Sequence, residues 1–220
     1  MKQPLVSILI NNYNNAPFLE ECVRSALEQT YPHTEVIVYD DGSTDASLDI
    51  LRAFGKDIVL LAPNPNFGAR SINFNQAHAI WRAFQASRGD IVCLLDGDDA
   101  FLPTKVERVV DAFRTGTPTL VQHLFTAVDE RGKVVEPRRP ARLIVPTREG
   151  FPSYRAFILR YHCLFHLFLQ TSALSFPRPF LQKHLPIPPD PYDKLWADFR
   201  LSRRAAFEGS VVTLEEPLAL

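Results

Sequence analysis

Cysteine is scarce in this chain, and the few cysteines follow neither a disulfide nor a metal-binding pattern. Three occur in 220 residues, namely Cys22, Cys93 and Cys163, and no two are spaced as Cys-x-x-Cys. An odd number at wide spacing argues against a disulfide framework and against a zinc site. Cys93 lies within an apolar run, so we expect it to be a small buried hydrophobic residue. This use of cysteine predicts a reducing, cytoplasmic setting.

Long hydrophobic runs are absent as well. A helix that crosses a bilayer needs about 20 consecutive apolar residues, and no stretch of the sequence approaches that length. The first residues, Met1–Pro4, lead directly into a short apolar run and lack the shape of a signal peptide. We therefore predict a cytoplasmic protein, with any membrane contact restricted to peripheral association at the inner face of the membrane.

A strong excess of either charge is also missing. The 24 Lys and Arg residues nearly balance the 25 Asp and Glu residues, which leaves a formal net charge of −1. Because such a surface attracts a polyanion poorly, we expect no nucleic-acid partner. Hydrophobic residues make up 46% of the 220, which is enough apolar material for one core and predicts a single domain over residues 1–220.

The first hundred residues alternate short apolar runs with helical patterns. Pro17 opens one helical pattern, because its fixed φ and missing donor suit a first helical position. Apolar runs separated by helices are typical of a parallel sheet that is covered on both faces. We therefore expect an α/β fold with strands at 5–10, 36–39, 58–61 and 91–95, and with helices at 17–27, at 44–54 and ending near 87.

The second half of the chain is less regular. Residues 118–145 have the composition of strands joined by a turn, and residues 177–191 are rich in proline. A final helix is expected from about 195 to 207, because Gly209 is a natural helix stop. A last strand should follow at 211–214.

An aromatic-rich segment spans residues 151–168. His162 and His166 are four residues apart and could share a helical face. The glutamate of a metalloprotease motif is missing, so we expect packing rather than metal ligation. Arg155 and Arg160 leave an interfacial role open for this segment.

Polar side chains gather where three of the predicted strands end. These clusters are Asn11–Asn15, Asp40–Ser43 and Asp96–Asp99. In a parallel sheet, ligands bind at the carboxyl ends of the strands. Three polar clusters at three strand ends therefore predict one common rim, and they point to a binding site there.

Asp96, Asp98 and Asp99 place three carboxylates within four positions. Like charges this close repel unless a cation neutralises them. Mg²⁺ and Mn²⁺ prefer oxygen ligands and accept bound phosphates in the rest of their shell. The alternative is a solvated acidic turn that caps the helix starting near Pro103, but a position directly after a buried strand favours the metal site.

The cluster after the second strand has both a structural and a functional explanation. Gly42 permits a tight turn, and Ser43 or Thr44 is placed to cap the next helix. This does not explain the adjacent carboxylates of Asp40 and Asp41. A carboxylate here could accept a hydrogen bond from a base N–H or a ribose hydroxyl.

Taken together, these motifs resemble family 2 glycosyltransferases of the GT-A fold. Residues 6–14 (VSILINNYN) followed by 36–45 (VIVYDDGSTD) are similar to the family's nucleotide-binding half. Residues 87–99 (SRGDIVCLLDGDD) look like the segment that ends in its Asp-x-Asp motif, and residues 196–218 (WADFRLSRRAAFEGSVVTLEEPL) look like its acceptor-side helix and the following strand. The order and spacing of these segments make the combination specific.

The resemblance implies a GT-A (Rossmann-like) three-layer α/β sandwich with a mostly parallel central sheet. Residues 1–100 would form the nucleotide-binding half and residues 101–220 the acceptor-side half. The implied reaction moves a sugar from a nucleotide-diphosphate donor, most commonly a UDP-sugar, to a hydroxyl of a carbohydrate or lipid-linked acceptor. It would proceed with inversion, use Mn²⁺ or Mg²⁺, and serve polysaccharide or glycoconjugate synthesis.

The resemblance also implies roles for individual residues of the nucleotide site. Tyr13 would stack on the base, with Asn11 beside it. Asp41 would hydrogen-bond the base, and Asp96 would approach the ribose or the sugar.

Asp98 and Asp99 would hold the metal ion that bridges the diphosphate, and Asp198 would be the general base. An acidic residue in a first helical turn commonly only complements the helix dipole, so the role of Asp198 as base rests on the resemblance. The base would take a proton from the acceptor hydroxyl, whose oxygen attacks the anomeric carbon opposite the leaving group.

The chain departs from the family pattern at three places. Ala197 stands where a glutamate usually precedes the catalytic aspartate, residues 64–76 form a longer segment than usual, and many relatives continue past the equivalent of Leu220 into a tail that bears Arg and His. Ala197 favours the alternative of a catalytically weak or inactive nucleotide-sugar-binding protein. A phosphatase is a third interpretation, but its Asp nucleophile would stand where this chain has Asn11 and Asn12.

Overall fold

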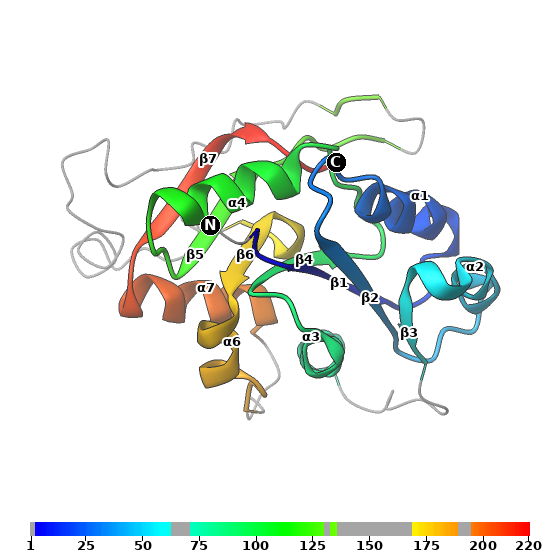
Figure 1. The fold of residues 1–220 in the computed structure, drawn as a ribbon. Coiled ribbons are helices and arrows are strands. Elements are labelled where there is room, and N and C mark those ends of the chain that lie inside the picture. Colours follow the sequence, from blue (N-terminus) through cyan, green and yellow to red (C-terminus); the bar gives the residue numbers. More distant parts are fainter. Residues whose placement is uncertain (1–2, 63–70, 130–132, 136–168, 189–194) are drawn as a thin grey trace.

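The structure is a computed structural model that describes residues 3–62, 71–129, 133–135, 169–188 and 195–220 (Figure 1). Its strands are β1 (Val6–Asn12), β2 (Thr34–Asp40), β3 (Val59–Leu61), β4 (Ile91–Asp96), β5 (Leu120–Leu124), β6 (Leu174–Pro177) and β7 (Val211–Pro217). Its α-helices are α1 (Ala16–Leu27), α2 (Ser47–Ala53), α3 (Ile72–Ala86), α4 (Lys105–Thr115), α6 (Arg178–His184) and α7 (Ala197–Glu208). Two short 3-10 helices are η1 (Gly55–Asp57) and η3 (Thr171–Ala173).

Within the described residues, the strands form one seven-stranded sheet in the order β3–β2–β1–β4–β6–β5–β7. β1 pairs in parallel with both β2 and β4, and β2 pairs in parallel with β3. β6 runs antiparallel to both β4 and β5, whereas β5 pairs in parallel with β7. The predicted α/β fold with a mostly parallel sheet is confirmed.

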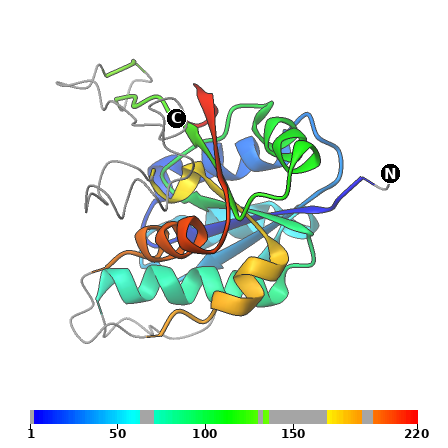
Figure 2. The same ribbon diagram turned by 90° about the vertical axis from the view of Figure 1, so that its left-hand side faces the viewer.

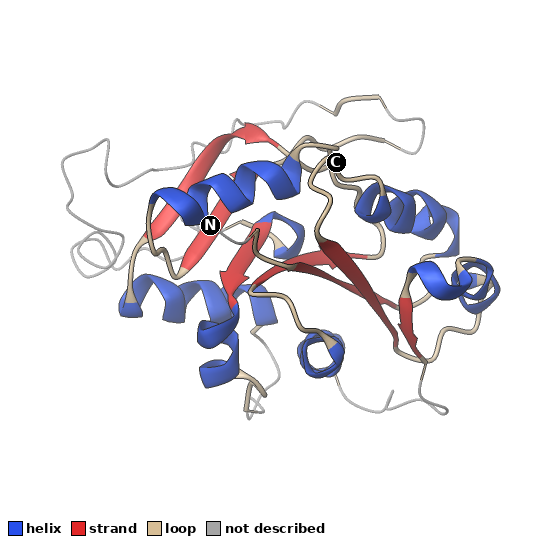
Figure 3. Cartoon of the chain, in the orientation of Figure 1, coloured by secondary structure: helices blue, strands red, loops and turns tan. Residues whose placement is uncertain are grey.

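Successive residues of the central strand β1 face two separate cores. Ile8 and Ile10 belong to a core shared with α1, α2 and α4, whereas Leu9 belongs to a core shared with α3, α6 and α7. Helices therefore cover both faces of the sheet, and the predicted three layers are confirmed (Figures 1 and 3). Because both faces of this strand are buried, its central residues Ile8, Leu9 and Ile10 are continuously apolar instead of alternating with polar residues.

Helix α2 is shorter than predicted, and the expected cap by Ser43 or Thr44 is wrong. The helix begins at Ser47, and its N-cap residue is Ala46, which makes no capping hydrogen bond. The Asp45 Oδ1 atom accepts from the backbone N–H of Ser47 at 2.9 Å. The Ser43 hydroxyl instead donates to Asp40 Oδ2 at 2.7 Å and accepts from the backbone N–H of Asn14 at 2.9 Å. These bonds use the hydroxyl inside the turn, so it does not cap the helix.

The second half contains two elements that the sequence pattern did not predict. β6 has four residues, and α6 has seven residues within the segment that the sequence indicated only as proline-rich. Elements this short hold too few residues for a helical or strand period to show. The final helix and strand are confirmed, with α7 beginning at Ala197, two residues later than expected.

The expectations for the aromatic-rich segment fall outside the described residues. This applies to the packing of His162 and His166 and to the interfacial role of Arg155 and Arg160. None of the helices in the described ranges is both long and apolar enough to cross a bilayer.

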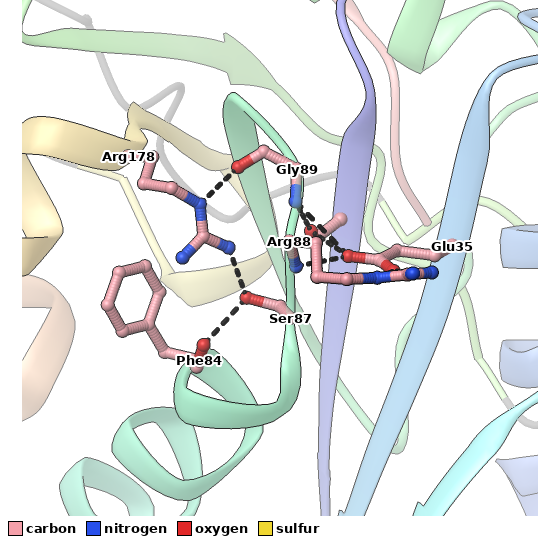
Figure 4. Close-up of polar contacts among 7 residues, drawn as sticks. Glu35, Phe84, Ser87, Arg88, Gly89 and Arg178 are labelled. Atoms are coloured by element: carbon pink, nitrogen blue, oxygen red, sulfur yellow. Dashed lines mark hydrogen bonds and ion pairs between the residues drawn. The ribbon is translucent and has the colours of Figure 1, made fainter.

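At the amino ends of the parallel strands, Glu35 and Arg178 tie four segments together (Figure 4). The Glu35 carboxylate on β2 accepts from the Ser7 hydroxyl on β1 at 2.7 Å and from the backbone N–H of Gly89 at 3.1 Å. Arg178, the first residue of α6, donates to the Ser87 hydroxyl at 2.7 Å and to the Gly89 carbonyl oxygen at 2.5 Å. The turn before β4 is thus held from two sides.

The hydrogen bonds to Glu35 outweigh the cost of its burial. Burial alone would raise the pKa of Glu35, but hydrogen bonds from the Arg88 backbone N–H, from the Ser7 hydroxyl and from the Arg88 guanidinium lower it below its usual value. A carboxylate whose pKa is lowered by folding stabilises the protein at neutral pH. That contribution disappears as the pH falls through the folded-state pKa.

We expect Glu35→Gln to lower the free energy of unfolding by about 1–2 kcal/mol at neutral pH, because hydrogen bonds to a charged acceptor are lost. In urea denaturation followed by circular dichroism, the difference from the unchanged protein should shrink as the pH falls below 4.5, the ordinary pKa of a glutamate. The control Glu20→Gln removes a carboxylate from an exposed pair with Arg24 at 2.8 Å and should cost less than about 0.5 kcal/mol. Equal costs for the two variants would contradict the structural role of Glu35.

Candidate functional site

The polar strand ends meet at one edge of the sheet because β1 lies at the centre of the parallel region. The register pairs Asn11 with Asp96 on β4 and Asn12 with Asp40 on β2. The Asn11 amide donates to Asp96 Oδ1 at 2.8 Å, and the Asn12 amide donates to Asp40 Oδ2 at 2.7 Å. Amide groups of β1 therefore link the acidic ends of both neighbouring strands.

Of the adjacent pair Asp40 and Asp41, the first shapes the turn after β2. Asp40 is fully buried, and its Oδ1 accepts from the backbone N–H groups of Gly42 at 3.1 Å and Ser43 at 2.8 Å. Gly42 has a φ of 83°, in the left-handed region that glycine enters without steric cost. Asp40 therefore has a structural role, and Asp41 is left as the carboxylate of this cluster that meets a pocket.

A pocket of about 490 Å³, here named the rim pocket, lies over the strand ends. Its volume is typical of a small-molecule site. Two of its walls are exposed aromatic side chains, since Tyr13 is 52% exposed and Trp196 is 42% exposed. The lining residues are Asn11, Asn12, Tyr13, Asn15, Asp41, Ile72, Asn75, Gln76, Ala79, Asp96, Gly97, Asp98 and Trp196.

Asp41 lines the rim pocket in surroundings that disfavour its charged form. Burial, followed by repulsion from Asp40, raises the pKa of Asp41 to about 6, although a hydrogen bond from the Asn75 side chain acts in the opposite direction. A carboxylate with a raised pKa that lines a pocket is typical of a functional group.

Asp96, the last residue of β4, is fixed through one of its oxygens. Asp96 Oδ1 accepts from Asn11 at 2.8 Å and from Gln76 Nε2 at 3.3 Å. Burial, and then repulsion from Asp99 and Asp98, raises the pKa of Asp96 to about 7. The acidic turn thus carries more negative charge than its protein donors neutralise.

Asp99 has its own anchor on the other side of this turn. The Ser172 hydroxyl donates to Asp99 Oδ2 at 2.5 Å and accepts from the backbone N–H of Asp96 at 3.0 Å. Burial raises the pKa of Asp99 despite the hydrogen bond from Ser172, and repulsion from Asp98 adds to the increase. A second pocket of about 230 Å³ lies here, lined by Asp96, Asp98, Asp99, Phe125, Gln170, Ser172, Ala173, Ala219 and Leu220.

Gly97 lets the acidic turn pack closely on the end of β1. A Cβ atom at this position would lie 2.7 Å from Asn12 Oδ1 and 3.0 Å from Asn15 Nδ2. Both distances are shorter than ordinary van der Waals contacts, so a side chain here would push the turn away from the rim.

Asp198 reaches the same region from α7. It is the second residue of that helix, after the fully buried Ala197. Burial raises the pKa of Asp198, against a hydrogen bond from the Phe199 backbone N–H. The charge of Asp198 in turn helps to raise the pKa of Asp96, and Trp196 lines the rim pocket. α7 lies alongside α3, whose first turn lines the same pocket (Figure 2).

Several residues of the site were missed by sequence reasoning. These residues either take part in the hydrogen bonds around the acidic groups or line the rim pocket beside them. They are Asn75, Gln76, Thr171, Ser172 and Trp196. The first turn of α3 did carry a signal, because three polar amides cluster there in a helix that is otherwise largely apolar. The sequence contains no local signal for the hydroxyls of η3, since their position depends on how β6 pairs with β4.

The acidic turn offers oxygen ligands for a metal ion but not a complete shell. Among the described residues, no three His, Cys, Asp or Glu side chains converge to enclose a metal ion. The donors that are present are carboxylate oxygens, which suit Mg²⁺ or Mn²⁺. Such a site fits a cation whose remaining ligands come from a phosphate-bearing substrate.

Comparison with known sequences places the chain in a family. A family model described as "Glycosyl transferase family 2" matches residues 7–174, which is most of the chain. The chain belongs to glycosyltransferase family 2. An uncharacterized glycosyltransferase of Nostoc sp. is 30% identical over 223 residues, which cover 97% of this chain and 63% of the relative. The chain thus spans less than two thirds of that family member.

Solved structures of glycosyltransferases share the fold of this family 2 chain. S. aureus TarS 1-349 in complex with UDP has a TM-score of 0.70 and 16% identity, over 98% of this chain and 59% of that one. Glucosyl-3-phosphoglycerate synthase of Mycobacterium tuberculosis, in complex with Mn²⁺, UDP and glucosyl-3-phosphoglycerate, has a TM-score of 0.64 and 19% identity, over 99% of this chain and 71% of that one. The expected GT-A fold is confirmed.

We expect Asp41→Asn to raise the free energy of unfolding by about 1 kcal/mol at pH near 7.5, after discounting for solvent screening. The folded-state pKa of about 6 lies above the ordinary value of 3.8, so the folded protein loses stability as the pH rises between these values. The gain should vanish near pH 4 in urea denaturation. The control Asp57→Asn, at an exposed position of η1, should leave the free energy of unfolding unchanged. A loss of stability in Asp41→Asn at neutral pH would contradict the unfavourable burial of the Asp41 carboxylate.

Proposed function

We propose that this family 2 chain carries an inverting glycosyltransferase activity. It transfers a sugar from a nucleotide-diphosphate donor, in first place a UDP-sugar, to an acceptor hydroxyl in polysaccharide or glycoconjugate synthesis. The observation that carries the proposal is the rim pocket, which Tyr13, Asp41 and Asp98 line together. Asp198 stands beside it, close enough to act on the pKa of Asp96.

The rim pocket offers the contacts that a nucleotide needs. Tyr13 presents an exposed ring on which the base stacks, with Asn11 beside it. Asp41 accepts a base N–H, and uracil offers one such group on its ring. Asp96, fixed through Oδ1, faces the ribose or the sugar. The UDP bound in two glycosyltransferases that share this fold supports the choice of UDP.

The acidic turn is proposed to hold Mn²⁺ or Mg²⁺ through Asp98 and Asp99, with diphosphate oxygens of the donor as further ligands. Burial, and after it repulsion from neighbouring carboxylates, raises the pKa values of Asp96 and Asp99, and a bound cation would favour their charged forms. When bound, the metal ion would stabilise the charge that grows on the departing nucleoside diphosphate. The Mn²⁺ bound in the mycobacterial synthase supports this assignment.

Asp198 is proposed to act as the general base. Its raised pKa makes the carboxylate a better proton acceptor than an ordinary aspartate. The carboxylate takes the proton of the acceptor hydroxyl, whose oxygen bonds to the anomeric carbon while the bond to the phosphate oxygen breaks on the opposite face. This displacement inverts the configuration of the sugar.

A nucleotide-sugar-binding protein with little or no transfer is the alternative. Ala197, which replaces the usual glutamate, favours it in the sequence. In the structure, Ala197 is fully buried in the core shared with α3, so this position serves packing. A transfer assay separates the two functions.

We expect calorimetric titration to show that UDP binds at least about tenfold more tightly with Mn²⁺ than without it, a difference of about 1.4 kcal/mol in binding free energy. UDP should also bind more tightly than dTDP or GDP. Asp98→Ala should lose this metal dependence, whereas the control Asp57→Ala at an exposed site should keep it. No binding of any nucleotide would overturn the proposed donor site. Unchanged metal dependence in Asp98→Ala would remove Asp98 from the metal site.

We expect Asp198→Asn to keep its affinity for UDP but to lose transfer by about 10²- to 10⁴-fold, the usual contribution of a general base. Release of UDP from UDP-glucose and UDP-N-acetylglucosamine, with sugar acceptors added, measures this. Normal turnover in the variant would show that another group is the base. Binding of UDP without any release by the unchanged protein would favour the binding-protein alternative.

A further inference from the structure

Helix α3 turns one of its faces toward the rim pocket. The pocket-lining residues of this helix are Ile72, Asn75, Gln76 and Ala79. Steps of three and four residues place side chains on one helical face. Other residues of the helix, such as Ile80, pack in the core. The polar residues of the first turns are therefore directed at the site and not at the core.

The Gln76 side chain links three segments of the site through its amide nitrogen. Nε2 donates to Asp96 Oδ1 at 3.3 Å and to Thr171 Oγ1 at 3.0 Å. These partners lie 20 and 95 positions away in the sequence. One side chain thus joins α3 to the end of β4 and to η3.

Both side-chain donors to Asp96 reach the same oxygen atom. Asn11 Nδ2 donates to Oδ1 at 2.8 Å, and Gln76 Nε2 donates to the same atom. In the part of the chain that the structure describes, no hydrogen bond reaches Oδ2, and this atom is not enclosed. Two donors on one oxygen restrict the rotation of the carboxylate. They leave Oδ2 as the oxygen that a ligand of the rim pocket can reach.

The position of Gln76 is unfavourable for the stability of the fold. Its Oε1 atom is buried and accepts no hydrogen bond from the described residues. A buried carbonyl oxygen without a donor costs free energy on folding. A methionine has a similar length and no strong hydrogen-bonding group, so it would avoid this cost. Such a local conflict is expected where a side chain serves a ligand site.

Gln29 provides a contrasting glutamine whose role is structural. Its Nε2 donates to the carbonyl oxygens of Ser25 at 2.8 Å and Leu102 at 3.1 Å. Its Oε1 accepts from the backbone N–H of Val106 at 2.9 Å. Both ends of this amide are paired with backbone groups, and Gln29 lines neither the rim pocket nor the second pocket beside Asp99.

We propose that Gln76 is a positioning residue of the donor site, which turns Oδ2 of Asp96 toward the bound nucleotide and links that carboxylate to η3. The inference rests on the proposed nucleotide-sugar site. It adds to that site a residue that acts on the ligand through Asp96 and contributes little to the stability of the fold.

The variant Gln76→Met tests this role against a structural one. The affinity for UDP in the presence of Mn²⁺, measured by calorimetry, should fall by about tenfold, because Asp96 loses a donor that orients it. The Tm, measured by circular dichroism, should fall by no more than about 2 °C or should rise, because an unpaired buried oxygen is removed. Gln76→Glu keeps the shape of the side chain but replaces the donor with an acceptor, so it should weaken UDP binding at least as much.

The control Gln29→Met should show the opposite pattern. Its Tm should fall by about 4 °C or more, because two backbone carbonyl groups and one backbone N–H lose their partner. Its affinity for UDP should equal that of the unchanged protein.

An affinity of Gln76→Met for UDP within about twofold of the unchanged protein would overturn the proposal. A fall in Tm as large as that of Gln29→Met would also overturn it, since Gln76 would then be a structural residue. If the unchanged protein binds no UDP, the proposed donor site is rejected and the role of Gln76 with it. If the unchanged protein and Gln76→Met bind UDP equally well, the donor site stands and only the positioning role is rejected.

Discussion

The cost of burying carboxylates at one edge of a parallel sheet governs the arrangement of this molecule. Parallel strands that end at the same edge bring their acidic ends together, where desolvation and mutual repulsion both oppose charge. Amide and hydroxyl donors partly offset that cost: Asn12 for Asp40, Asn75 for Asp41, Asn11 and Gln76 for Asp96, and Ser172 for Asp99. The pKa values of Asp41 and Asp96 nevertheless remain at about 6 and about 7. The protein therefore stabilises the charged forms of these carboxylates only in part. A further hydrogen-bond donor, such as a base N–H or a sugar hydroxyl, or a cation would stabilise them further.

The reversed strand β6 completes this edge. β6 runs antiparallel between β4 and β5, and η3 leads directly into it. This path carries the Thr171 and Ser172 hydroxyls to the end of β4, where they bond Gln76 and Asp99. Because β6 runs antiparallel to β4, it begins at the edge where the parallel strands end. The residues just before β6 can therefore supply hydroxyl groups to that edge.

The two faces of helix α7 carry different side chains. Its inner face packs in the core through Ala197 and Leu201 and sets Asp198 beside the acidic strand ends. Its outer face carries the exposed Arg203 and the partly buried Phe199 and Phe207. Because successive residues of a helix turn by about 100°, the packing of the inner face also determines which side chains face outward.

The sequence alone determined the layers and most of the rim. Buried parallel strands are largely apolar, and each ends at a visible polar cluster, so β1, β2 and β4 and the clusters Asn11–Asn15, Asp40–Ser43 and Asp96–Asp99 could be inferred from local pattern. The roles of Tyr13 and Asp198 followed from a family resemblance, because one exposed tyrosine or one acidic helix start has no distinctive local pattern.

Only the tertiary structure decided that Asp40 holds the turn after β2, and that Ser43 serves this turn instead of a helix. It also decided the places of β6, Gln76 and Ser172. The places of β6, Gln76 and Ser172 depend on contacts between residues that lie 20 to 95 positions apart, and local periodicity carries no information about which distant donor reaches a buried acid.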